Sequence, residues 1–476
     1  MIRRTAPPDA DVKDVVNDSR KVTPGALFCA CPGERENGAE YIKQAVSNGC
    51  AAVVCEKTPA IPCGYITVDN ARRAYSKLCA AINGSPQNKL KLAAVTGTNG
   101  KTTTTSMIFH ILSRIHGDKS AALIGGVKNV VGGISTKAIQ TTPDPRELYK
   151  MLADAVNSGA GYGVIEASSH ALDYEKLAPC TFEVGVMTNL TEDHLDYHGC
   201  MENYFRTKCR LVGMCRRFVS NNDDVFTKRV NCPHFSLYDG DYTAKIISLD
   251  KNGSVFEYRG EKNAVCRIPV TGRFNVYNAL AALCAVELMG EDAGDAAEAL
   301  SDFEGAPGRF ERYKLKNGAE AVIDYAHTPD ALENALSAAR SICGGRLICV
   351  FGCGGDRDRG KRRMMGAVSS ANADLTVITS DNSRSERAED IIKEILHGVD
   401  KSSKYTVIQS RRDAILYALG AAGENDVVLL AGKGHEDTET DRYGTRPFSE
   451  AEIIKEFNDG GSAYGNNDVK GSGGAL

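Results

Sequence analysis

The chain has 476 residues, 42% of them hydrophobic and 25% charged, with a formal net charge of −4. This length exceeds what one hydrophobic core supports, so we expect two to four domains with the composition of an ordinary soluble protein. The slight negative charge provides no basic surface of the kind that binds nucleic acid.

The first block of the chain extends to about residue 88. Its start lacks the apolar stretch of a secretory signal, and no run of about 18 apolar residues occurs anywhere, so we expect a cytoplasmic protein without membrane contact. Short apolar runs at 51–55 and 65–68 predict strands, and helical stretches surround them. The turn-rich segment 83–86 closes the block.

Sixteen cysteines are scattered along the chain, and none belongs to a Cys-x-x-Cys pair. A zinc ribbon or a thioredoxin-type site is therefore not expected. Because no targeting signal points to an oxidising compartment, we predict that most of the cysteines are small buried hydrophobic residues.

The segment 95–105, VTGTNGKTTTT, carries the clearest chemistry of the chain. An apolar run at 92–95 leads into it and an amphipathic pattern at 107–115 leads out, which predicts a strand, a glycine turn and a helix. Backbone N–H groups of such a turn bind phosphate oxygens at the positive end of the helix dipole. Lys101 would add a charge on the outer phosphates, and the Thr102 hydroxyl would bind Mg²⁺. The segment predicts a nucleoside triphosphate site, although its glycines stand closer together than in the common phosphate loop.

Two further strand candidates, 164–166 and 184–188, follow in the second block, which we place at residues 89–306. The first ends at Glu166, and His194 follows the second. Open α/β sheets bind their ligands at the carboxyl ends of the strands. We therefore expect both side chains beside the triphosphate, where they would help to hold Mg²⁺.

The rest of the second block contains an alternating polar region at 244–268, which predicts hairpins, and a helical pattern at 275–289. The third block, 307–459, alternates strand and helix patterns, as is typical of a mostly parallel sheet covered by helices. Its strand candidates are 321–324, 346–351, 375–379 and 427–431. The glycine-rich segment 460–476 predicts a disordered tail.

Nine strings of the chain resemble the Mur ligase family, whose members build the peptide stem of peptidoglycan. Those of the second block are TGTNGKTT at 96–103, EASSHAL at 166–172, TNLTEDHLDYHG at 188–199, YFRTK at 204–208 and GRFNVYN at 272–278. Those of the third block are PGRFE at 307–311, DYAHTPD at 324–330, GCGGDRD at 352–358 and GKGHE at 432–436. The last three strings resemble the family branch that adds the third residue to UDP-N-acetylmuramoyl-L-alanyl-D-glutamate.

The resemblance implies an α/β fold of three domains. Residues 1–88 would bind the UDP end of the substrate, 89–306 would form a central P-loop mononucleotide-binding parallel sheet for ATP, and 307–459 a Rossmann-like domain for the incoming amino acid. In the implied reaction, the D-glutamate γ-carboxyl attacks the γ-phosphate of ATP, and an amine then displaces phosphate from the acyl phosphate. Mg²⁺ and cations would offset the repulsion between carboxylate and triphosphate. The product would serve peptidoglycan synthesis, and with it cell-wall biogenesis, cell shape and cell division.

At the ATP site, the resemblance implies roles for residues of the second and third blocks. The catalytic residues would be Lys101, Lys208, His194 and Glu166. The Mg²⁺ ligands would be Thr102, Glu166, His194 and a Lys208 carbamylated by CO₂. The ATP contacts would be Gly97, Thr98, Asn99, Gly100, Lys101, Thr102, Thr103, Asn275, Asn278, Arg309 and Asp324. Arg309 would act only when the domains close. Without the resemblance, the string around Lys208 would be interpreted as a solvated helix face.

At the UDP-peptide site the match is less complete. The implied contacts are Ser19, Thr141, Thr142, Ser168, Tyr174 and Lys176. Many family members carry glutamine and arginine where this chain has Tyr174 and Lys176. Lysine still attracts an anion, but it lacks the two-pronged guanidinium.

The segment 381–384, DNSR, bears on the choice of the third amino acid. It is similar to the Asp-Asn-Pro-Arg of members that add meso-diaminopimelate, whereas lysine-adding members lack the arginine. A guanidinium binds a carboxylate through two parallel hydrogen bonds, and diaminopimelate is lysine with a second carboxylate. We therefore expect meso-diaminopimelate, with L-lysine as the alternative. Ser383 replaces the proline and so removes its fixed φ, and we expect Arg384 to be held less firmly as a result. The alternative is that Arg384 is a surface residue on a polar loop. The implied amino-acid contacts are Arg357, Asp381, Asn382, Ser383, Arg384, Gly432 and Glu436, with Asp381 and Glu436 facing an ammonium group.

Two other functions stay open on sequence grounds. A relative that has lost ligation would act as a scaffold subunit, but Lys101, Glu166, His194 and Lys208 are all present. The folate polyglutamate ligase branch shares the phosphate loop but is not expected to carry GCGGDRD and GKGHE together. We expect a monomer that binds UDP-N-acetylmuramoyl-L-alanyl-D-glutamate, meso-diaminopimelate, ATP and Mg²⁺, and neither nucleic acid nor membrane.

Overall fold

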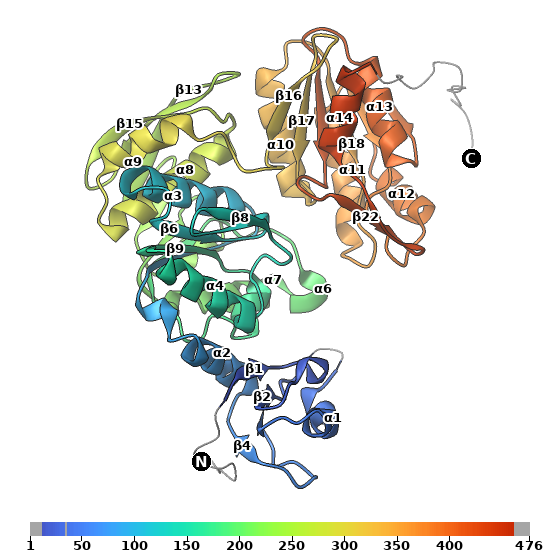
Figure 1. Ribbon diagram of the computed structural model, residues 1–476. Helices are drawn as coiled ribbons and strands as arrows, with labels where there is room; N and C mark the ends of the chain where they lie inside the picture. Colours follow the sequence, from blue (N-terminus) through green and yellow to red (C-terminus); the bar gives the residue numbers. More distant parts are fainter. Residues whose placement is uncertain (1–11, 34–35, 461–476) are drawn as a thin grey trace.

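A computed structural model describes residues 12–33 and 36–460 of the chain. These residues form three α/β units in sequence order, each built around a sheet (Figure 1). The predicted tail lies outside the described residues from position 461 onward. No helix in the described part combines the length and the apolar character that crossing a bilayer requires.

The N-terminal unit is a parallel sheet of four strands in the order β1-β2-β3-β4. The elements are β1 (Asp14–Val16), β2 (Ala26–Cys29), α1 (Ile42–Ser47), β3 (Ala52–Cys55), β4 (Tyr65–Thr67) and α2 (Ala71–Ile82). Helix α2 lies between this sheet and the central unit (Figure 1), and one apolar cluster extends from Val15 and Val54 through Tyr75 to Leu148. The N-terminal unit therefore shares part of its core with the central unit.

The central unit is built on eleven strands in the order β15-β14-β13-β12-β11-β10-β5-β9-β6-β7-β8. The strands are β5 (Lys91–Thr96), β6 (Ala121–Ile124), β7 (Lys128–Val131), β8 (Ile134–Lys137), β9 (Tyr162–Glu166), β10 (Phe182–Met187), β11 (Cys215–Asn221), β12 (His234–Ser236), β13 (Tyr242–Asp250), β14 (Gly253–Arg259) and β15 (Asn263–Ile268). The strands from β13 to β6 are parallel, and antiparallel strands extend both edges. The predicted hairpins at 244–268 are confirmed, and they continue the same sheet.

Helices cover both faces of the central sheet. They are α3 (Lys101–His116), α4 (Pro145–Asn157), α5 (Ser169–Asp173), α6 (Leu195–His198), α7 (Met201–Cys209), α8 (Arg273–Met289) and α9 (Ala293–Ala299). On one face, Met107 and Leu280 pack on Val95, and on the other face Leu152 packs near Ala94. Because adjacent residues of a strand point to opposite faces, a strand buried on both sides must be apolar throughout, as the run at 92–95 is.

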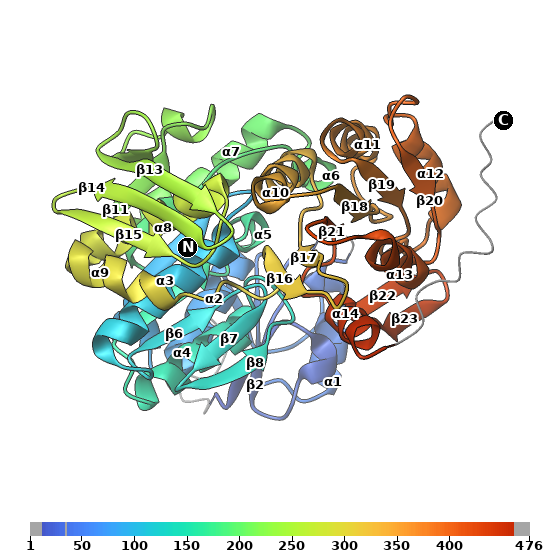
Figure 2. The same ribbon diagram turned by 90° about the horizontal axis from the view of Figure 1, so that it is seen from above.

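The C-terminal unit is a six-stranded sheet in the order β16-β17-β21-β18-β19-β20, parallel except for β16, with a separate hairpin β22-β23. The strands are β16 (Glu311–Lys314), β17 (Glu320–Asp324), β18 (Leu347–Phe351), β19 (Leu375–Ile378), β20 (Tyr405–Val407), β21 (Val427–Ala431), β22 (Thr438–Asp441) and β23 (Gly444–Pro447). The helices are α10 (Pro329–Ile342), α11 (Gly360–Asn372), α12 (Ala388–Leu396), α13 (Arg411–Ala421) and α14 (Glu450–Asn458). The first three helices pack on one face and the last two on the other (Figure 2).

Every strand and helix predicted from the sequence is present, with ends displaced by a few residues at most. The predicted three-domain α/β architecture is therefore confirmed. All sixteen cysteines carry free thiols. Eight of them are buried, and another, Cys200, is exposed. The prediction that most cysteines are buried thus holds for half of them.

Candidate functional site

The phosphate loop connects the end of β5 to the first turn of α3. Gly97 and Gly100 have φ angles of 144° and 84°, a region that side chains with a Cβ rarely adopt. A Cβ on Gly97 would lie 1.9 Å from the Thr188 hydroxyl oxygen, so a larger residue is also excluded by space. Lys101 folds back over the loop, and its Nζ donates to the carbonyls of Gly97 and Thr98 at 2.9 and 2.8 Å. The loop thus wraps around the Lys101 ammonium, and the N–H groups of Thr98 and Asn99 tie it to Asn189.

The ends of β9 and β10 flank the phosphate loop because these strands pair with β5 on either side. Glu166 ends β9 and is buried, and its Oε2 accepts a hydrogen bond of 3.1 Å from the Thr102 hydroxyl. Its Oε1 accepts from the Gly126 N–H at 2.8 Å. Burial is the main reason that the pKa of Glu166 lies above its usual value, and the charges of Lys101 and Arg309 act in the opposite direction.

His194 follows β10 and adopts a left-handed conformation with φ 54°. Its Nε2 lies 3.4 Å from an oxygen of Asp193. Burial lowers the pKa of His194 to about 4, so the imidazole is neutral and has a lone pair to offer a metal. Across the described residues, no group of three or more His, Cys, Asp and Glu side chains is placed to hold a metal by itself.

Lys208 lies in α7, buried beneath the phosphate loop rather than on a solvated helix face. Its Nζ donates to the Gly97 carbonyl at 2.8 Å and lies 4.6 Å from the ring centre of Tyr204. Burial first, and then the like charge of Lys101, hold the pKa of Lys208 well below its ordinary value. An amine whose pKa is lowered, and which loses its proton more readily than an exposed lysine, therefore sits next to the phosphate loop.

A cavity of about 300 Å³ lies between the central and C-terminal units, and its wall includes Asn278, Arg309 and Asp324. Arg309 crosses from the C-terminal unit, stacking on the Tyr325 ring at 4.4 Å, and its Nη2 lies 3.4 Å from the Thr102 hydroxyl. The structure therefore brings the predicted arginine to the phosphate loop. Asn275 does not line this cavity: its Nδ2 donates to the Thr271 carbonyl, and it lies behind Asn278.

Three contacts between the units were not anticipated from the sequence. Asp193 approaches His327 of the C-terminal unit at 3.8 Å, and the phosphate-loop side chain Asn99 donates to Asp330 at 3.0 Å. An ion pair joins Lys137 to Asp437. Asp193, His327 and Asp330 all stand in the strings quoted above, but nothing in their spacing indicates that they meet.

Most of the predicted UDP-peptide residues lie beside Glu166. The Thr142 hydroxyl donates to the Glu166 carbonyl at 2.6 Å and lies 3.2 Å from the Ser168 hydroxyl. Lys176 donates to the Thr142 carbonyl at 2.8 Å. Thr141 adjoins Thr142 in the chain. The Arg72 guanidinium lies over the Tyr174 ring, with its Cζ 4.1 Å from the ring centre. Ser19 stands apart in the N-terminal unit, where its hydroxyl donates to Gln44 at 2.7 Å.

The predicted amino-acid residues gather where β18, β19 and β21 end. Gly355 N–H donates to the Asn382 carbonyl at 2.9 Å, which joins the loop that carries Arg357 to the loop that carries Arg384. The Asn382 amide donates to Glu436 at 2.7 Å. Two guanidinium groups and two carboxylates, those of Asp381 and Glu436, therefore belong to one cluster of loops.

Arg384 is held in place although Ser383 replaces the expected proline. Its backbone φ is 51°, its N–H donates to the Thr440 carbonyl at 3.1 Å, and its Nη1 donates to the Gly355 carbonyl at 2.8 Å. Ser383 is buried, and a Cβ on Gly355 would lie 1.9 Å from the Ser383 carbonyl oxygen. Neighbouring loops thus supply the constraint that a proline ring would have provided.

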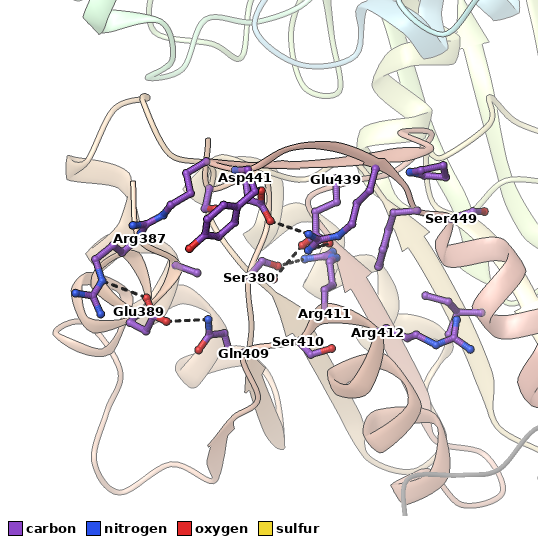
Figure 3. A pocket seen from close by; sticks show the side chains of 18 of the residues that line it. Ser380, Arg387, Glu389, Gln409, Ser410, Arg411, Arg412, Glu439, Asp441 and Ser449 are labelled. Carbon is purple, nitrogen blue, oxygen red and sulfur yellow. Dashed lines mark hydrogen bonds and ion pairs between the residues drawn. The ribbon is translucent and has the colours of Figure 1, made fainter. Parts of the chain in front are cut away.

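A larger hollow, of about 870 Å³, lies behind the segment 380–386 (Figure 3). Its wall contains arginine and acidic side chains in pairs: Arg387 with Glu389, Arg412 with Glu456, and Arg446 with Glu439. These charges compensate one another, so the hollow offers no net attraction for a polyphosphate. Of the predicted site residues, it is lined by Ser383 alone.

Three family profiles match successive parts of the chain. They are described as Mur ligase family, catalytic domain, at residues 11–84, Mur ligase middle domain at 95–286, and Mur ligase, glutamate ligase domain, at 308–434. The chain is similar to proteins named UDP-N-acetylmuramoyl-L-alanyl-D-glutamate--2,6-diaminopimelate ligase. That of Clostridium acetobutylicum is 38% identical over 462 residues, 94% of this chain and 95% of that protein. That of Gloeobacter violaceus is 42% identical over 449 residues, 90% of each. A solved structure of a ligase with this name superposes with a TM-score of 0.66 at 31% identity, covering 94% of this chain and 95% of the other.

Proposed function

The chain belongs to the Mur ligase family, and from that premise we propose that it is the ATP-dependent ligase that adds meso-diaminopimelate to UDP-N-acetylmuramoyl-L-alanyl-D-glutamate. The observation that carries the proposal is a phosphate loop flanked by Glu166, His194 and Lys208 and contacted by Arg309 of the facing unit, which also carries an arginine–carboxylate cluster. The reaction forms an amide bond with release of ADP and phosphate, as a step of peptidoglycan precursor synthesis.

In the first step, an oxygen of the D-glutamate γ-carboxylate attacks the γ-phosphorus of ATP. The bond from that phosphorus to the bridging oxygen breaks, and ADP leaves with the electron pair. The barrier is mainly electrostatic, because a carboxylate must approach a triphosphate. Lys101 supplies a cation at the phosphate loop, and Arg309, whose Nη2 lies 3.4 Å from the Thr102 hydroxyl, supplies another from the facing unit. We propose that ATP lies in the cavity lined by Asn278 and Asp324.

The donor set around the phosphate loop suits Mg²⁺, which prefers oxygen ligands. The Thr102 hydroxyl and the Glu166 carboxylate lie within 3.1 Å of each other, and the neutral His194 imidazole is available as a third ligand. A bound Mg²⁺ would neutralise the charge that develops on the phosphate oxygens. It would also favour the ionised form of the buried Glu166 carboxylate.

Lys208 fits the proposed carbamate. Carbamylation needs a neutral amine, and burial lowers the pKa of the Lys208 amine, which favours that form. The product would be an anion beside Lys101 and the phosphate loop, where a positive environment exists to balance it. We propose that this anion helps to hold Mg²⁺.

In the second step, the deprotonated amine of diaminopimelate attacks the acyl carbon. The carbon–oxygen bond to phosphate breaks, phosphate leaves with the electron pair, and the nitrogen loses a proton to form the amide. We propose that Arg384, with Arg357, binds the distant carboxylate, and that Asp381 and Glu436 bind the ammonium at the same end. Asn382, Ser383 and Gly432 would shape the loops between them.

We propose the domain roles that the sequence predicts: residues 1–88 for the UDP end, with Ser19 as a contact, 89–306 for ATP, and 307–459 for the amino acid. Thr141, Thr142, Ser168, Tyr174 and Lys176 would bind the muramoyl-peptide. We further propose that the enzyme acts as a cytoplasmic monomer.

The test is release of ADP and phosphate from ATP with UDP-N-acetylmuramoyl-L-alanyl-D-glutamate, comparing meso-diaminopimelate with L-lysine. We expect rapid turnover with diaminopimelate and slow turnover with lysine. Equal turnover with both would overturn the choice of amino acid, and no turnover with either would overturn the ligase itself and favour the scaffold alternative.

A further inference from the structure

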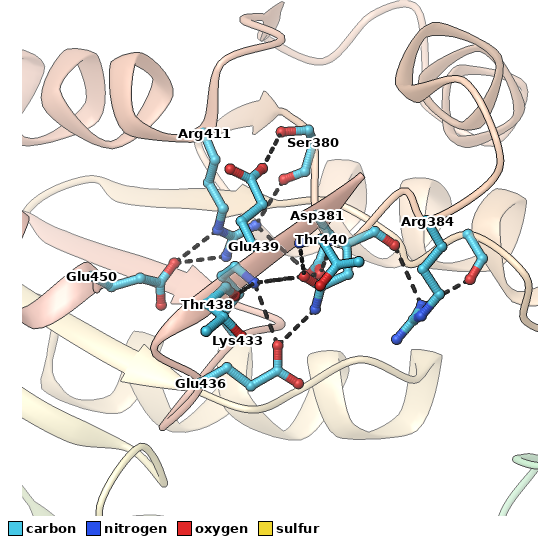
Figure 4. A network of polar contacts seen from close by, with 12 residues as sticks. Ser380, Asp381, Arg384, Arg411, Lys433, Glu436, Thr438, Glu439, Thr440 and Glu450 are labelled. Carbon is cyan, nitrogen blue, oxygen red and sulfur yellow. Dashed lines mark hydrogen bonds and ion pairs between the residues drawn. The ribbon is translucent and has the colours of Figure 1, made fainter. Parts of the chain in front are cut away.

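A fully buried arginine, Arg411, stands behind the amino-acid cluster, in the first turn of α13 (Figure 4). Its Nε donates to Glu450 at 2.9 Å, its Nη2 to the Ala431 carbonyl at 2.8 Å and its Nη1 to the Ser380 carbonyl at 3.2 Å. One side chain therefore joins the ends of β19 and β21 to the start of α14. These are the strand ends that carry Asp381 and the 432–436 loop.

A second buried cation, Lys433, also lies near Asp381. Its Nζ donates to the Thr438 carbonyl at 2.8 Å and to Asn382 Oδ1 at 3.2 Å, and it lies 3.4 Å from Glu436. The Asp381 carboxylate is 3.9 Å from Arg411 and 4.0 Å from Lys433. Both cations thus attract Asp381, but each of them has a closer hydrogen-bond partner.

The carboxylates of this network differ in their access to the cleft. Asp381, Glu436 and Glu450 face the buried cations Arg411 and Lys433, Arg384 adds a partly buried cation near Asp381 and Glu436, and Glu439 pairs with Arg446. Glu450 is inaccessible and is bound to Arg411, whereas Asp381 and Glu436 keep 10% and 29% of their side-chain surface exposed. An ammonium group entering from the cleft would therefore meet Asp381 and Glu436.

We propose that Arg411 is a positioning residue that selects the incoming amino acid by orienting the Asp381 carboxylate toward the substrate ammonium. Glu450 neutralises Arg411 from behind, so that Asp381 keeps its charge for the substrate. This inference rests on the proposed amino-acid site and adds to it a residue that does not touch the substrate. An arginine suits the task because its planar fork donates in three fixed directions, which an ammonium cannot reproduce.

The ionisation of Asp381 offers an independent readout. Burial alone would raise the pKa of Asp381, but Arg411, Lys433, the Asn382 N–H and His327 together hold it below its usual value. Arg411 is the largest of these opposing contributions, so its removal should raise the pKa of Asp381. The charged and titratable groups that face Asp381 are Arg411, Lys433, His327, Arg384, Glu450, Tyr325 and Cys353.

The test compares Arg411→Lys and Arg411→Ala with the wild-type enzyme in the ADP-release assay. We expect Arg411→Ala to raise the KM for diaminopimelate roughly ten- to hundredfold, with the KM for ATP unchanged, and Arg411→Lys to recover part of the loss. The acid limb of kcat/KM for diaminopimelate should move to higher pH in Arg411→Ala. The matched control is Arg412→Ala, the next residue of the same helix, which pairs with Glu456 at the surface.

Added guanidinium provides a second measurement that does not depend on the stability of the variant. The buried Arg411 is among the residues around the large hollow behind the site (Figure 3), so we expect Arg411→Ala to open the space of the guanidinium toward this hollow. Millimolar guanidinium should lower the KM of Arg411→Ala for diaminopimelate and leave Arg412→Ala unaffected.

The outcomes separate this inference from the proposed function. A wild-type enzyme without ligase activity would refute the proposed function. An active wild type, with Arg411→Ala binding ATP normally and showing an unchanged KM and pH profile for diaminopimelate, would refute the role of Arg411 alone. A loss of all substrate binding in both Arg411 variants, without rescue by guanidinium, would show that Arg411 only maintains the fold.

Discussion

Replacing Arg384 with alanine should remove most of the preference for diaminopimelate over lysine. In the structure, Nη1 of Arg384 is bound to the carbonyls of Gly355 and Asn382, at 2.8 and 3.3 Å. This fixes the guanidinium plane and leaves the edge formed by Nε and Nη2 for a carboxylate. Two charge-assisted hydrogen bonds at a partly buried site contribute about 3 kcal/mol, which is roughly a 150-fold change in kcat/KM.

The expected loss applies to diaminopimelate alone, because lysine has no carboxylate at that end. The assay is kcat/KM for each amino acid at saturating ATP and UDP-N-acetylmuramoyl-L-alanyl-D-glutamate, measured by ADP release. Arg387→Ala is the matched control, since Arg387 lies three residues further along and faces the large hollow rather than the cluster. An Arg384→Ala enzyme with the wild-type preference, or a wild type that uses lysine equally well, would refute the assignment.

Four further predictions concern the phosphate loop, the metal and the framework of the site. Lys101→Ala should lower kcat by at least about a hundredfold while the melting curve stays cooperative, because the lysine stabilises transferring phosphate charge; normal turnover would exclude this role. Lys208→Ala should be inactive and partly rescued by formate or acetate, which replace the carbamate oxygens, and wild-type activity in that variant would exclude the carbamate. Chelation of divalent cations by EDTA should stop ADP release and excess Mg²⁺ should restore it, whereas undiminished release would contradict the metal role of Glu166. Arg362 lowers the pKa of Glu386 to about 2 through hydrogen bonds, so Glu386 stabilises the fold above pH 4.5 and ceases to do so as the pH falls toward 2. Urea unfolding should therefore show that Glu386→Gln is about 2–3 kcal/mol less stable than the wild type at pH 7 and no less stable near pH 2. A difference in stability that persists at pH 2 would contradict this linkage.

The sequence by itself determined the elements and their order. The apolar run at 92–95, the glycine turn and the amphipathic pattern after it depend on residues within a few positions of one another, so periodicity alone reveals them. The same is true of the parallel arrangement of the third block, because a strand–helix alternation leaves few other topologies. Glu166 and His194 were predictable as neighbours of the phosphate loop, since parallel strands end at one edge of a sheet.

Only the tertiary structure decided which distant side chains meet. Asn99 binds Asp330 across 231 positions. Arg411 binds Glu450 across 39, in a segment where a lone arginine is typical of a solvated surface. The burial of Lys208 likewise cannot be inferred from the residues around it in the sequence. Its burial, and with it the lowered pKa of the amine, depends on the loops that cover α7. Local patterns encode the elements, but burial and long-range pairing depend on how those elements pack, and it is packing that turns ordinary lysine, arginine and aspartate residues into a site.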